Sequence, residues 1–288
     1  MSENQKLVVV TGGAGFVGSH LSLRLKEEGY QVISVDNYST GSKENHHEGI
    51  EYREGHTKHI ADLVSETPDL IYHLGEYARV EQSFDDVERV LESNVQGTQA
   101  VLEFARLKKS KLVYAGSSTK FADGGIGKDQ SPYAWTKATN TNLVQRYGDW
   151  FGLEYAITYF YNVYGPQERS DTQSGTLIAI FADKYQQNQP LTVRQPGTQR
   201  RNFTHVSDIV DGLLLVGTQG SGDEYGLGHP DSYSVIEVAE MFGGEIEFMP
   251  ERPGNRMNSS VDVRRAELEL GWKPKHNLPE YIATLTQS

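Results

Sequence analysis

Short apolar runs alternate with segments of helical spacing along the first half of the chain. The apolar runs are bounded by glycines or polar residues and cover 7–11, 31–36, 69–74, 111–114 and 155–159. The segments of helical spacing cover 19–28, 87–107 and a stretch that begins near residue 131. Unbroken apolar runs of this length are typical of parallel strands buried on both faces. Strands that alternate with helices predict an α/β fold with a doubly wound, mostly parallel sheet.

The last third of the chain has a different pattern. From about residue 165 onward, it is richer in proline, glycine and polar turns. We therefore expect a main domain over 1–164, to which segments near 192–228 return, and a smaller C-terminal lobe over 165–288. Doubly wound sheets bind ligands at the carboxyl ends of their strands, and we predict that the lobe covers that edge.

Composition excludes several classes of function. The 288 residues carry a net charge of -12, which argues against nucleic acid or an anionic membrane as a partner. Because the chain has no cysteine, disulfides, thiolate metal sites and a cysteine nucleophile are excluded. The amino terminus lacks a signal-peptide pattern, and its apolar run is too short to span a membrane. These features predict a cytoplasmic globular protein.

The nine histidines do not form a metal-binding pattern. His46, His47, His56 and His59 lie in one polar stretch without cysteine or a regular spacing of carboxylates. We interpret them as exposed loop residues and predict no metal site.

A glycine-rich turn joins the first predicted strand to the first predicted helix. Gly12, Gly15 and Gly18 allow a tight turn, close approach of a pyrophosphate, and close packing of the helix on the sheet. The amino terminus of the helix, with Phe16 and Val17, adds unpaired N–H groups and the positive end of the helix dipole. Such glycines can serve the turn alone, but the strand before them and the helix after them predict a Rossmann-type dinucleotide site.

The second predicted strand ends at an acidic residue. Asp36, followed by Asn37, lies 18 residues after Gly18. A carboxylate at this place accepts hydrogen bonds from the adenosine ribose and repels a 2′-phosphate. The sequence therefore predicts NAD, rather than NADP, as the cofactor.

Tyr133 and Lys137 are four residues apart at the start of a predicted helix. Pro132 suits the first helical position and Ser131 suits the cap, so that both side chains lie on one helix face. The pKa of a free tyrosine is about 10, and a neighbouring cation favours the phenolate. We predict that Tyr133 is an acid–base group that works near neutral pH.

With these residues in place, the chain resembles the extended short-chain dehydrogenase/reductase family, which includes nucleotide-sugar epimerases and dehydratases. The likeness runs from about Leu7 to Trp272. It is carried by TGGAGFVG at 11–18, VDNYSTG at 35–41, HLGEYARVEQS at 73–83, Asn94 with Gly97-Thr98, AGSSTKFAD at 115–123, YAWTK at 133–137, YFYNVYGP at 159–166, RNFTHVSDIVDG at 201–212, and RPGNR followed by LGWKP.

The resemblance implies catalytic and cofactor-binding roles. Ser117, or Ser118 one residue later, would donate a hydrogen bond to the reacting sugar oxygen. Tyr133 would be the acid–base, and Lys137 would lower its pKa and hold the nicotinamide ribose. Further residues implied around the cofactor are Leu74, Gly75, Asn94 and Phe160.

The resemblance also implies a nucleotide-diphosphate sugar as the substrate. The residues implied to contact it are Ser83, Ser117, Asn162, Arg201 and Arg252. Arginine suits a diphosphate because its planar fork binds two oxygens at once. Two alternatives stay open at this point, since Ser83 also suits a helix cap and Arg201 also suits a surface ion pair.

The implied reaction begins with NAD-dependent oxidation at C4, which gives a 4-keto intermediate. A 4-epimerase then reduces the opposite face, whereas a 4,6-dehydratase must also remove the C5 proton and protonate the C6 oxygen. Relatives that dehydrate or decarboxylate carry an acidic residue where this chain has Ser118 and Thr119. We predict a nucleotide-sugar 4-epimerase, with a 4,6-dehydratase or a 4-keto-sugar reductase as alternatives.

Two further expectations follow from the resemblance. Glu76 stands where the family has a small residue beside the cofactor, and we interpret it as a solvated loop carboxylate. The alternative is that Glu76 supplies the base that dehydration needs. The segments 87–107 and 134–150 resemble the helix pair that forms the dimer interface of relatives, which predicts a homodimer.

Overall fold

A seven-stranded sheet forms the centre of the main domain. The computed structural model describes residues 5–119, 127–170, 175–250 and 261–287. The strands are β1 (Leu7–Thr11), β2 (Gln31–Asp36), β3 (Glu51–Glu54), β4 (Leu70–His73), β5 (Lys111–Ser117), β6 (Tyr155–Phe160) and β11 (Gly222–Leu227). Their order is β11-β6-β5-β4-β1-β2-β3, and every neighbouring pair is parallel. The predicted doubly wound α/β fold is confirmed.

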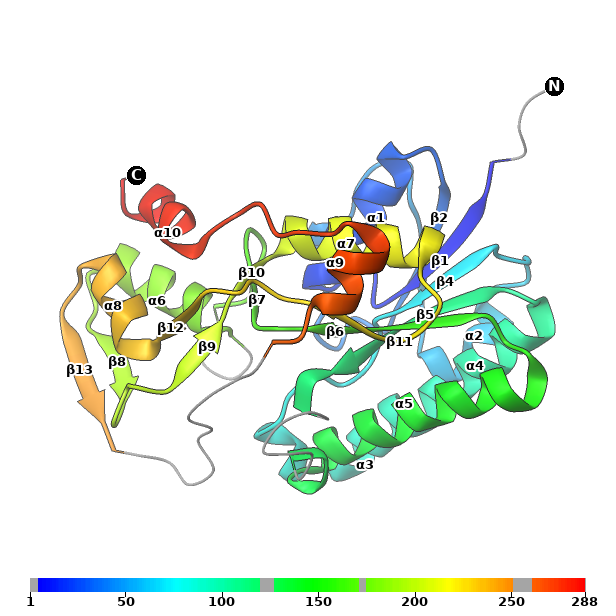
Figure 1. The fold of residues 1–288 in the computed structure, drawn as a ribbon, viewed down its shortest axis with the longest axis horizontal. Helices are drawn as coiled ribbons and strands as arrows, with labels where there is room; N and C mark the ends of the chain where they lie inside the picture. The colour runs from blue at the N-terminus through cyan, green and yellow to red at the C-terminus, as the bar shows by residue number, and fades with distance from the viewer. Residues whose placement is uncertain (1–4, 120–126, 171–174, 251–260, 288) are drawn as a thin grey trace.

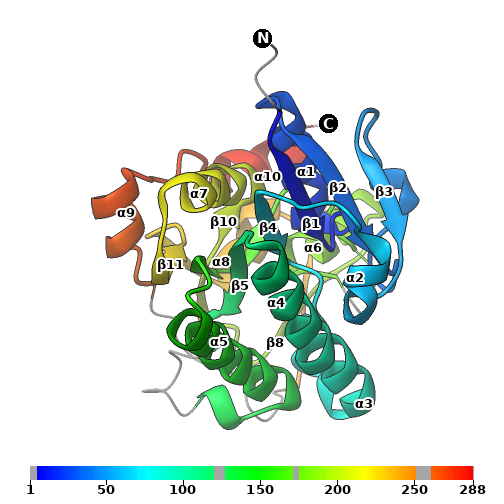
Figure 2. The same cartoon turned by 90° about the vertical axis from the view of Figure 1, so that its right-hand side faces the viewer.

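Helices cover both faces of this sheet (Figure 2). One layer holds α1 (Phe16–Glu27), α7 (Val206–Gln219) and α9 (Arg264–Leu270), and the other holds α2 (Ile60–Leu63), α4 (Gly97–Lys108) and α5 (Pro132–Phe151). In β1, Val8 and Val10 pack into the core on the α1 and α7 side, whereas Val9 packs into the core on the α4 and α5 side. Because successive strand side chains point to opposite faces, an unbroken apolar run is what a doubly covered strand needs.

The predicted helix over 87–107 is interrupted. Its first part is α3 (Val87–Val90), a π-helical turn follows over Leu91–Gln96, and α4 continues to Lys108. A π-helical turn shifts the register of the side chains that follow, and such turns are frequent at functional sites. Short 3₁₀ turns lie at Lys43–Asn45, Thr57–His59 and Gln82–Phe84.

The rest of the chain forms a smaller lobe beside the sheet (Figure 1). Its helices are α6 (Leu177–Gln186), α8 (Val235–Phe242) and α10 (Leu278–Thr286), packed around a separate apolar core. Its strands form two small pairs, β8 (Leu191–Arg194) with β13 (Ile246–Met249) and β9 (Arg200–Asn202) with β12 (Ser232–Ser234). A third pair, β7 (Val163–Tyr164) with β10 (Thr204–His205), lies where the chain passes between the two units. The chain returns from β10 into α7, which covers the main sheet, and then into β11, which is its edge strand.

Candidate active site

A large cleft runs along the carboxyl ends of the strands. Its volume is about 2090 Å³, and residues of both the main domain and the smaller lobe line it. The predicted site residues that line it are Gly12, Gly15, Phe16, Val17, Gly18, Asp36, Asn37, Leu74, Gly75, Ser117, Tyr133, Lys137, Phe160, Asn162 and Arg201. Residues that are distant in the sequence therefore meet in one space at the edge where doubly wound sheets bind their ligands.

The glycine-rich turn at one end of the cleft has the geometry that a dinucleotide requires. Gly12 has a φ of +71°, and a Cβ at this position would lie 2.9 Å from the Cα of Gly75. A Cβ on Gly18 would lie 2.0 Å from the carbonyl oxygen of Gly12. Helix α1 begins after Gly15 without a side-chain cap, and its first residues, Phe16 to Gly18, line the cleft. These residues fit the pyrophosphate of NAD.

Asp36 is held rigidly at the end of β2. Its carboxylate accepts hydrogen bonds from the backbone N–H groups of Ala14, at 3.0 Å, and Tyr38, at 2.8 Å. Burial raises the pKa of Asp36, while these hydrogen bonds oppose the rise. The next loop passes close by, because a Cβ on Gly41 would lie 3.0 Å from both carboxylate oxygens. This enclosed carboxylate fits a ribose with free hydroxyls and leaves little room for a 2′-phosphate.

Ser117 and Tyr133 meet at the middle of the cleft. The phenol of Tyr133 donates to the Ser117 hydroxyl at 3.3 Å, and Thr119 donates to the same oxygen from its own hydroxyl at 3.0 Å. Ser131 caps α5 by accepting a hydrogen bond from Ala134 N at 3.1 Å, which confirms the predicted start of this helix. Since Ser117 accepts these bonds, its own hydrogen remains available for an oxygen in the cleft.

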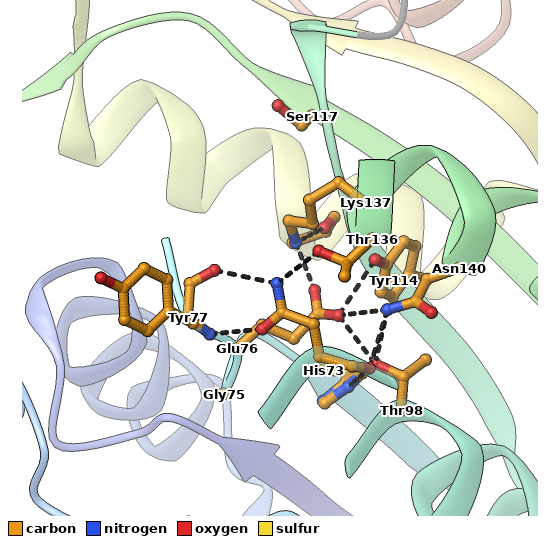
Figure 3. A network of polar contacts seen from close by, with 12 residues as sticks. His73, Gly75, Glu76, Tyr77, Thr98, Tyr114, Ser117, Thr136, Lys137 and Asn140 are labelled. Carbon is orange, nitrogen blue, oxygen red and sulfur yellow. Dashed lines mark hydrogen bonds and ion pairs between the residues drawn. The ribbon is translucent and has the colours of Figure 1, made fainter. Parts of the chain in front are cut away.

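Lys137 lies four residues after Tyr133 on α5, and its side chain belongs to a buried polar network (Figure 3). Its side chain is 7% exposed, and its ammonium donates to the carbonyl oxygen of Ala115 at 2.5 Å. The same ammonium forms an ion pair with Glu76, whose side chain is 1% exposed. The interpretation of Glu76 as a solvated loop carboxylate is therefore wrong. The loop after β4 turns this side chain inward, where the lysine charge compensates its own.

Three further side chains, none of them predicted from the sequence as a partner of Glu76, bind its buried carboxylate. Its Oε1 accepts hydrogen bonds from Thr98 at 2.7 Å, Asn140 at 2.7 Å and Tyr114 at 3.2 Å. Asn140 lies three residues after Lys137, on the same face of α5, which is the one signal in the sequence that points to it. The other two lie on α4 and β5, and no spacing connects them with Glu76.

Two predicted site residues lie outside the cleft wall. Asn94 is buried in the π-helical turn, where it accepts from Tyr77 N at 2.7 Å and donates to Tyr77 O at 3.1 Å. It therefore fixes the segment that follows Glu76. Ser83 is buried as well, and its hydroxyl donates to Val80 O at 2.5 Å. Arg252 lies outside the described residues.

The smaller lobe contributes the other end of the cleft. Arg201 on β9 and Asn162 after β6 both line it, and Asn162 donates to Asn202 O at 2.8 Å. Asn202 in turn donates to the carbonyl oxygens of His229 and Pro230, both at 3.0 Å. A guanidinium on β9 of the lobe and an amide just after β6 of the main sheet thus both line the cleft, and such groups suit a diphosphate.

The described residues contain neither a metal-binding cluster nor a membrane-spanning helix. In the ranges that the structure describes, no three histidine, aspartate or glutamate side chains cluster so as to hold a metal ion. No helix in those ranges is both long and apolar enough to cross a membrane.

Comparisons with known proteins agree with this geometry. Residues 8–228 match the model of the NAD dependent epimerase/dehydratase family. The UDP-glucuronic acid decarboxylase 1 of Xenopus tropicalis is 30% identical over 300 residues, which cover 96% of this chain and 70% of that protein.

Two solved structures carry the likeness into three dimensions. The UDP-glucose 4-epimerase of Thermotoga maritima, solved with UDP-glucose, has a TM-score of 0.89 at 26% identity, over 98% of this chain and 97% of that one. The UDP-glucose 4-epimerase of Thermus thermophilus, solved with NAD, has a TM-score of 0.85 at 27% identity, over 98% of each chain.

Proposed function

The chain belongs to the NAD-dependent epimerase/dehydratase family, and we propose that its reaction is the 4-epimerisation of a nucleotide-diphosphate hexose. NAD, when bound at the glycine-rich turn, supplies the oxidation and the re-reduction at C4 of the sugar. The residues of the chain position the sugar and move its proton. The glycine-rich turn and Asp36 hold the cofactor, and Arg201 with Asn162 holds the diphosphate.

The proton at the sugar hydroxyl is handled by Tyr133 and Ser117. Tyr133 takes the proton of the 4-hydroxyl during oxidation and returns it after the sugar has turned over. Ser117 donates a hydrogen bond to the same sugar oxygen, which is consistent with its hydrogen being available. Because both hydroxyls are fixed by the end of β5 and the first turn of α5, they need little reorganisation during the reaction.

The side chains next to Ser117 favour 4-epimerisation over dehydration. Ser118 and Thr119 follow it, and Thr119 directs its hydroxyl to Ser117. Neither side chain is a base at neutral pH. The nearby carboxylate of Glu76 is 1% exposed and is already bound by Lys137, Thr98 and Asn140. The described residues that directly follow Ser117, which end at Thr119, include no base to remove the C5 proton, as dehydration requires, whereas 4-epimerisation needs none.

A second candidate is the decarboxylation of a UDP-uronic acid. It is supported by the 30% identity to the decarboxylase of Xenopus tropicalis. Oxidation at C4 of a uronic acid gives a β-keto acid, and such acids lose carbon dioxide without a base. This reaction would use Ser117 and Tyr133 in the same way, but the relatives that decarboxylate carry an acidic residue where this chain has Ser118 and Thr119.

A panel of substrates separates these reactions. We would incubate the protein and NAD with UDP-glucose, UDP-N-acetylglucosamine and UDP-glucuronic acid, and follow each sugar by mass spectrometry and proton NMR. Unchanged mass with an inverted C4 centre is the expected result. Loss of carbon dioxide from the uronic acid would replace the proposal with decarboxylation, and loss of water from a hexose would replace it with 4,6-dehydration.

We also propose that the protein is a homodimer through the face formed by α3, α4 and α5. These helices lie side by side on one face of the sheet (Figure 2). Large apolar side chains on them and on the π-helical turn between α3 and α4 are exposed, among them Val87, Leu91, Trp135, Trp150 and Phe151. Size-exclusion chromatography with light scattering should give a molar mass twice that of one chain. A Trp135→Glu variant should elute as a monomer, and a wild-type monomer would contradict the proposal.

A further inference from the structure

Glu76 is a buried anion that the transfer of the sugar proton does not use. Its side chain is 1% exposed and that of its partner Lys137 is 7% exposed. Burying an ion pair is costly unless the geometry is good and the remaining lone pairs are satisfied. A small apolar residue would fill this position at less cost, so the carboxylate calls for an explanation beyond packing.

The network around Glu76 keeps it ionised and fixed. Thr98, Asn140 and Tyr114 donate to Oε1, while Lys137 donates to Oε2. Burial acts to raise the pKa of Glu76, but the Lys137 ammonium, the nearby His73 ring and the hydrogen bonds from Lys137 and Thr98 outweigh it, and the pKa lies below its ordinary value. At neutral pH, the pair is therefore a carboxylate beside an ammonium, with no net charge.

A chain of hydrogen bonds connects this pair to the glycine-rich turn. The Thr98 hydroxyl donates its single hydrogen to Glu76. Because the hydroxyl oxygen can then only accept, His73 Nε2 must be the donor in the 2.9 Å hydrogen bond to Thr98. His73 Nδ1 then accepts from the Thr11 hydroxyl at 2.7 Å, and Thr11 accepts from Gly75 N at 3.0 Å. Burial lowers the pKa of His73 to about 4, which keeps the ring neutral. The carboxylate is thus the only charge on this chain of contacts besides Lys137.

We propose that Glu76 balances the charge of Lys137 and thereby sets the preference of the site for oxidised over reduced NAD. The oxidised nicotinamide ring carries a positive charge and the reduced ring is neutral. An uncompensated ammonium as deeply buried as that of Lys137 would repel the oxidised ring. A redox-neutral cycle needs the oxidised form as its resting state, and the carboxylate removes the repulsion. The inference rests on the proposed function in one respect, the placement of the nicotinamide beside Lys137.

The test compares the affinities of the two forms of the cofactor in a Glu76→Gln variant. Glutamine keeps the size of the side chain and an oxygen acceptor but removes the charge. Dissociation constants for NAD⁺ and NADH are measured by calorimetry on wild type and variant. We call the dissociation constant for NADH divided by that for NAD⁺ the affinity ratio. In the variant, we expect the affinity ratio to fall at least tenfold, mainly because NAD⁺ binds more weakly. A ratio within twofold of wild type in the folded variant would overturn the proposal.

A matched control separates charge from structure. Tyr114→Phe removes one hydrogen bond to Glu76 but keeps the negative charge of the carboxylate. The ratio of the NADH to the NAD⁺ dissociation constant should therefore stay within twofold of wild type, even if the melting temperature of the variant is lower. A fall of the ratio in this variant equal to that in Glu76→Gln would overturn the charge explanation.

Variants of Lys137 cover the case in which Glu76→Gln does not fold. Lys137→Met leaves the carboxylate unbalanced and should raise the ratio. The double variant Glu76→Gln/Lys137→Met has no charge, and its ratio should return to within threefold of wild type. A double variant whose ratio equals that of Lys137→Met would overturn the proposal. All constants are measured without a sugar, so that they hold whichever sugar reaction the enzyme catalyses.

Discussion

The phenol of Tyr133 donates a hydrogen bond to the hydroxyl of Ser117 across 3.3 Å. The two residues belong to different elements, the first turn of α5 and the last position of β5. Their contact places the two hydroxyls side by side in the cleft. In the proposed reaction, one sugar hydroxyl meets both, with Tyr133 as the acid–base group and Ser117 as the hydrogen-bond donor.

Removal of the phenolic oxygen should therefore stop turnover without loss of the cofactor. We expect Tyr133→Phe to lower kcat by about 10²–10⁴, the range for a positioned acid–base group. The dissociation constant for NAD should stay within about twofold of wild type, because the glycine-rich turn and Asp36 are unchanged. Tyr155→Phe, at the far end of β6, is the matched control and should keep full turnover. Full activity in Tyr133→Phe would exclude the phenol from the chemistry.

Asp36 should decide between NAD and NADP. Asp36→Asn keeps the shape of the side chain and removes its charge, so that hydrogen bonds from the ribose hydroxyls become weaker. A hydrogen bond to a charged group contributes about 1.5–3 kcal/mol, which predicts an NAD dissociation constant raised roughly 10- to 100-fold. NADP should lose less affinity, since the repulsion of its 2′-phosphate is removed. Fluorescence titrations with both cofactors measure the change, and equal losses for the two would contradict the role of Asp36.

The sequence predicted the strands that are covered on both faces better than those at the edges. Strands β1 and β2 have the predicted bounds, because burial on both sides demands an unbroken apolar run. The edge strand β3 has the sequence Glu-Tyr-Arg-Glu and was not predicted. Strand β11, at the other edge, contains Gly222 and Asp223 and was also missed. Edge strands face solvent along one side, and their polar residues hide the pattern.

In the site too, residues that lie close together in the sequence could be predicted, whereas contacts between distant segments could not. The turn from Gly12 to Gly18 and the pair Tyr133 and Lys137 follow fixed spacings within single elements, and the structure brings all of them to the cleft. The environment of Glu76 could not be predicted, because its partners come from α4, β5 and α5. Which side of a loop faces inward depends on these tertiary contacts rather than on spacing.

Gly18 should tolerate no side chain. A Cβ there would lie 2.0 Å from the carbonyl oxygen of Gly12, which is backbone and cannot move aside. We expect Gly18→Ala to destabilise the protein by about 1–3 kcal/mol through overpacking and to weaken NAD binding. Gly244→Ala is the control, since its nearest neighbour would be an ordinary contact at 3.5 Å from Leu191. Thermal unfolding with and without NAD measures both effects, and equal behaviour of the two variants would contradict the close packing of the turn.

Glu168 should make the stability of the fold depend on pH near neutrality. It lines the cleft, where it accepts hydrogen bonds from Gly165 N at 3.0 Å and from Thr176. Burial raises the pKa of Glu168 to about 7, although these hydrogen bonds oppose the rise. In the unfolded chain, the pKa of a glutamate is about 4.3, so that the folded state binds more protons between these two values. The free energy of unfolding should therefore fall as the pH rises from about 4.3 to about 7.

The size of this effect is about 2 kcal/mol, because the side chain is only partly enclosed and solvent weakens the full value of the shift. Urea unfolding at a series of pH values should show this slope in wild type and a flatter one in Glu168→Gln. Glu247→Gln, which changes an exposed carboxylate on β13, should leave the slope unchanged. If Glu168→Gln kept the wild-type slope, the proton taken up on folding would have to be bound elsewhere.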